Sequence, residues 1–235
     1  MKNFKLKYIM YEEMLLLIVN ENIENKELIK TLKTNRNTNL NFINRLKFFY
    51  RVYICPFSRL LPLVSKNDNL VDIGCGSGLF IFLLKKHVKP NNILGLEISE
   101  DLVKTCEDTI KSNELENVEV RKYDGFKFPD CISEYNVFSM IDILHHIPYN
   151  LQPNYLENLF NSMKKGDTLI LKDIDARSKF AIFNKIHDLI FSSQIPHERA
   201  AEDVKRICEK LGFSILSYEK NRMFVYPHFY LILKK

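Results

Sequence analysis

Three of the chain's seven glycines alternate in one short segment, at Gly74, Gly76 and Gly78, and this spacing restricts the fold more than any other feature. The apolar run that starts at Leu70 predicts a buried strand before the glycines, and the apolar pattern from Leu79 predicts a helix after them. A strand, a glycine turn and a helix bring backbone amides close to a nucleotide-like ligand, because any side chain on the turn would block that approach. We therefore expect a ligand of this kind at the turn.

The residues around the glycines make this signal more specific. An acidic residue, Asp72, stands two positions before a G-x-G-x-G pattern, which differs from the G-x-G-x-x-G of dinucleotide-binding folds. The segment 72–78 resembles the first motif of the class I S-adenosylmethionine (SAM) dependent methyltransferases. The resemblance extends from Phe48 to Lys235. It implies SAM as cofactor, S-adenosylhomocysteine (SAH) as product, and cofactor-binding roles for Asp72, Gly74, Gly76 and Gly78.

The same resemblance implies an α/β fold. Its expected form is a Rossmann-like, seven-stranded, mostly parallel sheet with helices on both faces, an antiparallel last strand and a helical N-terminal extension. Residues 1–45 are expected to form the extension or lid, and residues 46–235 the methyltransferase domain.

A second strand, 92–98, carries an acid near its C-terminal end, Glu97. A carboxylate at this place can accept hydrogen bonds from both hydroxyls of a ribose. Glu97 matches the acid of the family's second motif, and we assign Glu97 and Ile98 to the cofactor site.

Two further acids follow expected strands. In many family members an Asp after the third strand accepts a hydrogen bond from the adenine amino group, and Asp124, followed by Gly125, fits that place. The alternative is an aspartate that only forms a turn before a glycine. Asp142 follows the fourth strand, 135–141, where the resemblance places the transferring methyl group, and we assign it to the cofactor site together with Asp124 and Gly125. The N-P-P-Y type tetrad of nucleobase amino methyltransferases is absent there, so no DNA partner is expected.

The segment Phe49-Tyr50-Arg51 precedes the glycine turn by about 20 residues. In many family members the helices ahead of the first strand close over the cofactor, so Arg51 is a candidate to bind the methionine carboxylate of SAM. The alternative is that Tyr50 packs in the core and Arg51 is solvated.

His145 and His146 come just after the expected fourth strand and are candidate catalytic residues. A histidine near the reaction site can act as a general base or can orient its loop through hydrogen bonds, and both roles stay open. Adjacent histidines do not share a helical face, and no carboxylate stands at ligand spacing from them. We therefore expect no metal site.

The last part of the chain contributes candidates for the acceptor side of the site. Asp173 and Asp175 follow the fifth strand, 168–172, and His187 and Asp188 interrupt the apolar pattern of the next helix. A histidine beside a carboxylate can deprotonate a hydroxyl, so we add His187 and Asp188 to the catalytic candidates. Near the last strand, Tyr226 and His228 are substrate-binding candidates together with Asp173 and Asp175. A polar helix face and edge-strand packing are the alternatives.

Charge is unevenly distributed along the chain. The net charge is +5, but residues 1–66 alone carry 12 Lys and Arg against 5 Asp and Glu, a balance of +7. The excess forms either a solvated basic face or a region that attracts an anionic carrier, an RNA or a membrane surface. The five cysteines are scattered without a C-x-x-C pair, which is typical of reduced thiols, so we expect a cytoplasmic location.

The methyl group of SAM is already activated, whereas a hydroxyl acceptor needs a base. The several His and Asp candidates therefore favour O-methylation of a small-molecule or carrier-linked acceptor. The alternatives are a methyltransferase acting on RNA or protein, and a non-catalytic protein that binds a partner.

Overall fold

The computed structural model describes residues 23–37, 42–181 and 196–235. In chain order its elements are α2 (Ile23–Leu32), α3 (Phe42–Ile54), α4 (Phe57–Leu60), η1 (Leu61–Leu63), β1 (Asn69–Ile73), α5 (Leu79–His87), β2 (Asn92–Glu97), α6 (Glu100–Ser112), β3 (Val118–Lys122), η2 (Asp130–Glu134), β4 (Val137–Ile141), η3 (Leu144–His146), α7 (Gln152–Ser162), β5 (Thr168–Ile174), α9 (Ala201–Leu211), β6 (Ser214–Met223) and β7 (Tyr226–Lys234).

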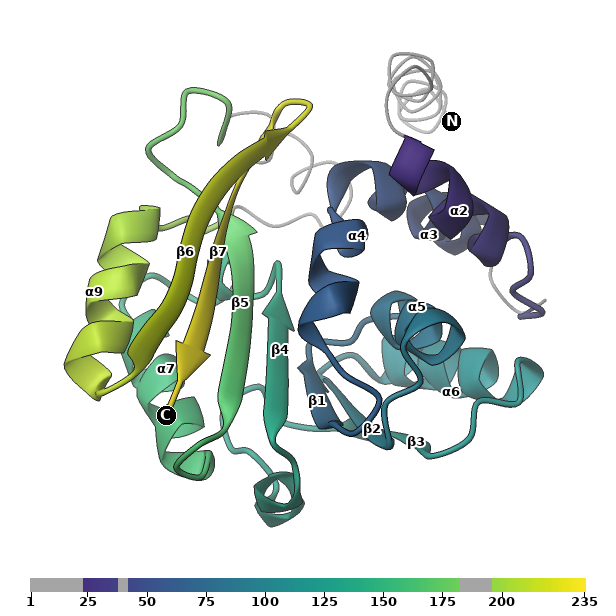
Figure 1. Ribbon diagram of the computed structural model, residues 1–235, viewed down its shortest axis with the longest axis horizontal. Helices are drawn as coiled ribbons and strands as arrows, with labels where there is room; N and C mark the ends of the chain where they lie inside the picture. The colour runs from purple at the N-terminus through teal and green to yellow at the C-terminus, as the bar shows by residue number, and fades with distance from the viewer. Residues whose placement is uncertain (1–22, 38–41, 182–195) are drawn as a thin grey trace.

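The strands form one seven-stranded sheet in the order β3-β2-β1-β4-β5-β7-β6. Strands β1 to β5 pair in parallel, while β7 runs antiparallel to both of its neighbours, β5 and β6. The strand order reverses between β1 and β4: β2 and β3 follow on one side of β1, and β4, β5, β7 and β6 on the other (Figure 1). Ligands of open α/β sheets bind at such a point. The expected sheet with an antiparallel last strand is confirmed.

Helices cover both faces of the sheet because successive strand residues point to opposite sides. Leu70 of β1 packs into a core that also holds residues of α2 to α6, and the next residue, Val71, packs into a second core with α7 and α9. Figure 1 shows these two helix groups on opposite sides of the strands.

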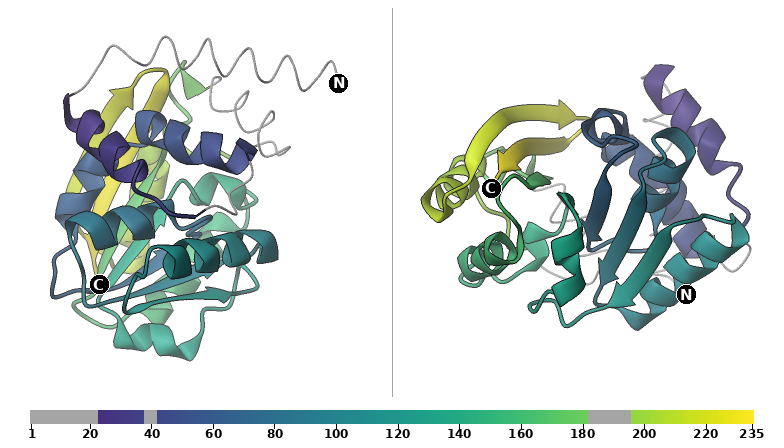
Figure 2. Two further views of the ribbon diagram at one scale, coloured as in Figure 1. Left: turned by 90° about the vertical axis from the view of Figure 1, so that its right-hand side faces the viewer. Right: turned by 60° about the horizontal axis from the view of Figure 1, so that its bottom comes forward.

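The N-terminal helix α2 is part of the first core. Its Leu28 and Leu32 are buried there, and α2 lies beside α3 and α5 (Figure 2). The loop after α2 is tied to α6, where the Asn37 side chain donates to the Thr109 hydroxyl at 2.9 Å. None of the described helices combines the length and apolar character that crossing a membrane requires. The division between residues 45 and 46 stays a prediction.

The fifth strand is longer than the sequence-based expectation. β5 continues two residues beyond Lys172, because its pairing with β7 extends to Ile174 and His228. β6 and β7 pair with each other up to the turn between Met223 and Tyr226. Helix α7 begins at Gln152, with a proline in its first turn.

Candidate active site

A cavity of about 520 Å³ opens at the carboxyl edge of the sheet. The glycine turn after β1, the end of β2, the loop after β4, helix α3 and the beginning of β7 all contribute to its wall. It therefore lies at the point where the strand order reverses, and its size is in the range of small-molecule sites.

The glycine turn forms one wall of this cavity through Gly74 and Gly76. Gly76 has a φ of +57°, and a Cβ built on it would meet no atom within 4 Å, so this residue faces open space. Gly78 does not line the cavity. A Cβ there would lie 2.7 Å from the Cys106 sulfur, so Gly78 allows α5 to approach α6 closely.

Glu97 joins the glycine turn to the loop after β2. One carboxylate oxygen accepts from the Gly76 amide at 2.9 Å, and the other accepts from the amides of Ile98 and Ser99 at 2.9 and 3.0 Å. The oxygen that accepts only from Gly76 retains one lone pair for a hydroxyl, whereas the two lone pairs of the other oxygen are taken by the Ile98 and Ser99 amides. Ile98 lines the same cavity and is 58% exposed, so it offers an apolar surface to a flat ligand group.

Asp72 is buried under the turn, where the Ser139 hydroxyl donates to it at 2.7 Å. Burial raises the pKa of Asp72 to about 7, and the Ser139 hydrogen bond and the charge of Arg51 only partly offset this. Ser139 was not among the residues expected from the sequence.

Asp124 and its neighbour Gly125 line different hollows in the structure. Asp124 accepts hydrogen bonds from the backbone amides of Phe126 and Lys127 at 2.8 and 2.6 Å, and these bonds lower its pKa. This is the turn geometry given above as the alternative, and Asp124 lines a separate hollow, whereas Gly125 lines the main cavity. Tyr123 lines both, and its hydroxyl lies 3.0 Å from that of Tyr155. No sequence motif pointed to this tyrosine pair.

Asp142 is held by two cations in the middle of the cavity. Its Oδ1 lies 2.5 Å from the fully buried Lys172 Nζ, and its Oδ2 lies 3.4 Å from the Arg51 guanidinium of α3. Burial disfavours the charged carboxylate, but Lys172 and then Arg51 outweigh this effect and hold the pKa of Asp142 well below its usual range. Arg51 is thus placed at the cavity by an ion pair. Tyr50 is buried and lines the cavity beside it.

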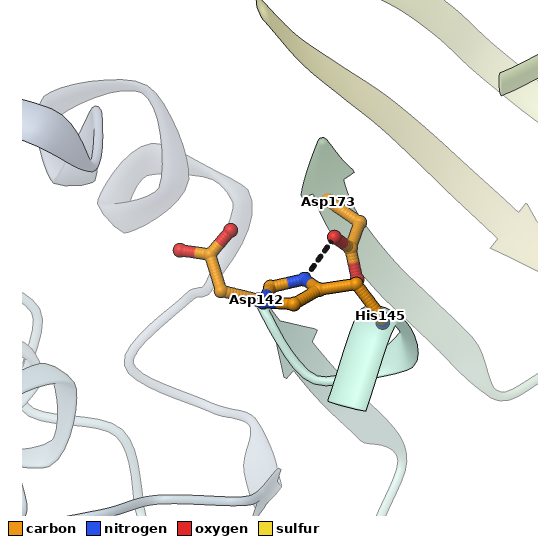
Figure 3. A group of neighbouring side chains, drawn as sticks. All are labelled: Asp142, His145 and Asp173. Carbon is orange, nitrogen blue, oxygen red and sulfur yellow. Dashed lines mark hydrogen bonds and ion pairs between the residues drawn. The ribbon is translucent and has the colours of Figure 1, made fainter. Parts of the chain in front are cut away.

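His145 is oriented by Asp173 (Figure 3). The His145 Nδ1 lies 2.5 Å from Asp173 Oδ1, and the His145 backbone amide donates to Asp173 Oδ2 at 3.2 Å. Both side chains are buried, and only His145 lines the cavity. The ring of His146 packs against that of His145 and is exposed at the mouth of the cavity.

Ligand atoms of Asp142, His145 and Asp173 lie within 4.8 Å of one another, as metal ligands do. However, the Lys172 ammonium already bonds to Asp142, and His145 Nδ1 is already engaged with Asp173. Sequence spacing gave no carboxylate near the histidines, whereas the fold brings Asp142 and Asp173 to His145, and the expected absence of a metal stays a prediction.

The loop that carries His145 is fixed by Gln152, the first residue of α7. The Gln152 side-chain amide is fully buried and donates to the backbone carbonyls of Leu144, Ile147 and His197. The His197 amide in turn donates to the His145 carbonyl at 2.7 Å. These bonds tie the segment before α9 to the His145 loop, and α9 begins at Ala201.

The remaining candidates are placed differently from one another. Asp175 does not line the cavity; it accepts from the Ala201 amide at 3.1 Å and pairs with Lys220 at 2.9 Å. Tyr226 and His228 do line it and are both buried. His187 and Asp188 lie outside the described residues.

With this geometry established, comparison with known proteins defines the family. Residues 64–212 match the model of a methyltransferase domain. The chain belongs to the class I SAM-dependent methyltransferases. It is an enzyme, and SAM is its cofactor.

Relatives differ in their acceptors. The chain is 30% identical over 194 residues to a tRNA (guanine-N(7)-)-methyltransferase of Prochlorococcus marinus, covering 74% of this chain and 85% of that protein. It is 29% identical to a malonyl-[acyl-carrier protein] O-methyltransferase of Ilyobacter polytropus, covering 66% of this chain and 58% of that protein. A SAM-dependent methyltransferase structure from Aquifex aeolicus has the same fold, with a TM-score of 0.62 at 20% identity, covering 81% of this chain and 95% of that one.

Proposed function

We propose that this methyltransferase transfers the methyl group to a hydroxyl oxygen of a small-molecule or carrier-linked acceptor, with His145 as the general base. The observation that carries the proposal is the buried contact of His145 with Asp173 at the wall of the cavity. A carboxylate on Nδ1 orients the ring, keeps the proton on Nδ1 and leaves Nε2 as the basic nitrogen.

The glycine wall and the charged residues around it fit SAM. The open space at Gly76 admits the amino-acid portion, with Arg51 positioned for its carboxylate, and the Glu97 oxygen that accepts only from Gly76 has acceptor capacity for a ribose hydroxyl. Ile98 and Gly125 would flank the adenine. Because Asp124 is engaged by the backbone amides of its own turn, it is a weaker candidate to bind the adenine amino group. Asp72 and Gly78 would stabilise the glycine turn without contacting SAM.

When bound, SAM supplies a methyl group on a positively charged sulfur. His145 takes the proton of the acceptor hydroxyl while the hydroxyl oxygen forms its bond to the methyl carbon and the carbon–sulfur bond breaks. Asp173 stabilises the protonated ring that results. Asp142, held by Lys172 and Arg51, fixes the backbone between the two halves of the cavity.

Tyr226 and His228 are proposed to contact the acceptor, because they line the cavity and His228 stands opposite Ile174, next to Asp173 in β5. Asp173 acts through His145. The catalytic roles expected for His146, His187 and Asp188, and a direct acceptor contact by Asp175, stay predictions.

Calorimetric titration with SAH tests the cofactor part of this proposal, and we expect micromolar affinity, about −8 kcal/mol. Methyl transfer from labelled SAM is then measured across acceptors with the wild-type chain and with His145→Gln. We expect His145→Gln to bind SAH normally and to lose about 10²–10⁴-fold in turnover. Normal turnover in this variant would refute the role of His145 as the base.

A second candidate is methylation of a guanine N7 in tRNA, which the similarity to the Prochlorococcus protein favours. The basic balance of residues 1–66 would then attract the RNA backbone. Guanine N7 reacts through a lone pair and loses no proton, so His145→Gln would leave this reaction largely unchanged. Salt-sensitive tRNA binding together with active His145→Gln would support this candidate over the first.

Two further predictions concern the whole protein. A cytoplasmic location follows from the scattered cysteines, all five of which are free thiols in the structure. The second prediction is contact of the basic N-terminal region with a membrane surface. In a flotation assay the protein should then rise with anionic vesicles and stay below with neutral ones.

A further inference from the structure

The half of the cavity next to His145 has a floor made by paired residues of β5 and β7. Ile174 of β5 stands opposite His228 of β7, and both line the cavity. Tyr226 lies two residues before His228 on the same face of β7, and its hydroxyl is 3.2 Å from that of Tyr50 in α3. Ile54 of α3 completes this surface. We call these five residues the acceptor floor.

His228 is the polar group in the acceptor floor that the protein leaves unused. Its side chain is 2% exposed, and neither ring nitrogen has a partner at hydrogen-bond distance; the Ile54 backbone makes only a weaker contact with the ring, which leaves at least one nitrogen for a ligand. Buried polar side chains are normally paired, so an unpaired one at a cavity wall indicates a ligand group that pairs with it. Burial and the nearby Lys172 charge lower the pKa of His228 well below its usual value, against the opposing effects of Asp142 and the Ile54 backbone. The ring is therefore neutral and offers one donor and one acceptor.

The charges around the cavity are already matched. Among the cavity-lining residues that the structure describes, Arg51 is the one lysine or arginine, and it pairs with Asp142. Lys172 lies behind the wall and bonds to the same carboxylate. A carboxylate or phosphate on the acceptor would find no cation of its own there, and burying it would be costly.

The other members of the acceptor floor are aromatic or branched aliphatic. The rings of Tyr50 and Tyr226 and the side chains of Ile54 and Ile174 present apolar area to whatever occupies this half of the cavity. Flat unsaturated rings bury well against such surfaces. The floor thus combines apolar area with the neutral His228 ring and a pair of tyrosine hydroxyls that bond to each other.

We propose that the acceptor is an uncharged, planar hydroxy compound that carries a second oxygen, and that His228 hydrogen-bonds to this second oxygen. The inference rests on the proposed function, because it takes the reacting hydroxyl to be the one that His145 deprotonates. Both histidines line the same cavity, and His228 stands opposite Ile174, the neighbour in β5 of the Asp173 that contacts His145.

The test uses naphthalene-2,7-diol as a fluorescent probe, with protein saturated by SAH. At pH about 7 the diol is uncharged, since phenolic hydroxyls ionise near pH 10. The matched anion is 7-hydroxy-2-naphthoate, in which a carboxylate replaces one hydroxyl. We expect the diol to bind at least about tenfold more tightly than the naphthoate, a difference of about 1.4 kcal/mol.

His228→Phe keeps an aromatic ring and removes both nitrogens. We expect this variant to bind the diol about tenfold more weakly, and His228→Gln, which retains a donor and an acceptor, to recover part of the loss. His87→Phe is the matched control, because His87 bonds to Thr31 away from the cavity, and it should bind the diol as the wild type does.

The possible outcomes distinguish a failure of the acceptor proposal from a failure of the proposed function. Normal SAH binding with tighter binding of the naphthoate would overturn the uncharged acceptor and leave the O-methyltransferase proposal intact. Equal diol affinity in His228→Phe and wild type would overturn the role of His228. Absence of SAH binding would overturn the proposed function and with it this inference.

Discussion

Replacing Asp173 by Asn is the sharpest test of how the site orients its base. In the wild type, Asp173 accepts three hydrogen bonds, from His145 Nδ1, from the His145 amide and from the Ile174 amide. Asparagine has the same shape, but its NH₂ group cannot accept. If NH₂ faces the His145 amide, a buried backbone donor loses its partner. If NH₂ faces Nδ1, the Ile174 amide loses its partner, and the ring must carry its proton on Nε2 and can no longer take one from the acceptor.

Both arrangements have calculable consequences. One buried donor without a partner costs about 1–3 kcal/mol. At about 2–4 °C per kcal/mol for a chain of this length, Tm falls by about 2–12 °C. A ring with its proton on Nε2 loses the contribution of general base catalysis, about 10²–10⁴-fold in kcat.

Two measurements report on these effects separately. Ring nitrogen chemical shifts of labelled His145 show which nitrogen carries the proton, and they need no knowledge of the acceptor. Thermal melting gives the stability change, with the exposed Asp101→Asn of α6 as the matched control. If Asp173→Asn keeps the proton on Nδ1 and turns over normally, the orienting role of Asp173 is refuted.

Three other changes test the rest of the site. Gly76→Arg fills the open space at the turn and should abolish SAH binding in calorimetry while the circular dichroism spectrum stays native; unchanged affinity would show that the cofactor lies elsewhere. Lys172→Met removes one partner of a buried ion pair and should destabilise by about 3–5 kcal/mol in urea unfolding, whereas a loss below about 1 kcal/mol would mean that Arg51 suffices to hold Asp142. The folded pKa of Asp72, about 7, exceeds its unfolded value, so the folded state binds more protons between the two values and stability falls as pH rises through this window. Asp72→Asn should remove that part of the pH dependence of Tm, and an identical pH profile would contradict it.

Features that depend on neighbouring residues could be predicted from the sequence. The glycine turn and Glu97 were recognisable because each motif lies within a few residues, and the structure brings both to the cavity. The parallel sheet followed from the resemblance that these motifs carry. Asp124 shows the opposite case, since the same local pattern suited a turn and an adenine contact, and the backbone bonds in the structure are those of the turn.

Side-chain contacts between residues of distant elements could not be predicted from the sequence. Lys172 reads in the sequence as the end of an apolar strand, and only the pairing of β4 with β5 brings its ammonium to Asp142. Gln152 resembles an ordinary first-turn residue, yet its amide joins the His145 loop to the segment before α9. In these cases the sequence contains the residue but no signal of its contact.

By itself, then, the sequence determined the family, the cofactor and the edge of the sheet where the site lies, because those follow from short motifs and from strand order. It left His145 and His146 equivalent as candidates. The tertiary structure distinguishes them, since the end of β5 places Asp173 beside the ring of His145 and leaves His146 at the surface. Which histidine is oriented depends on the register of two neighbouring strands, and that register is set by packing across the whole sheet.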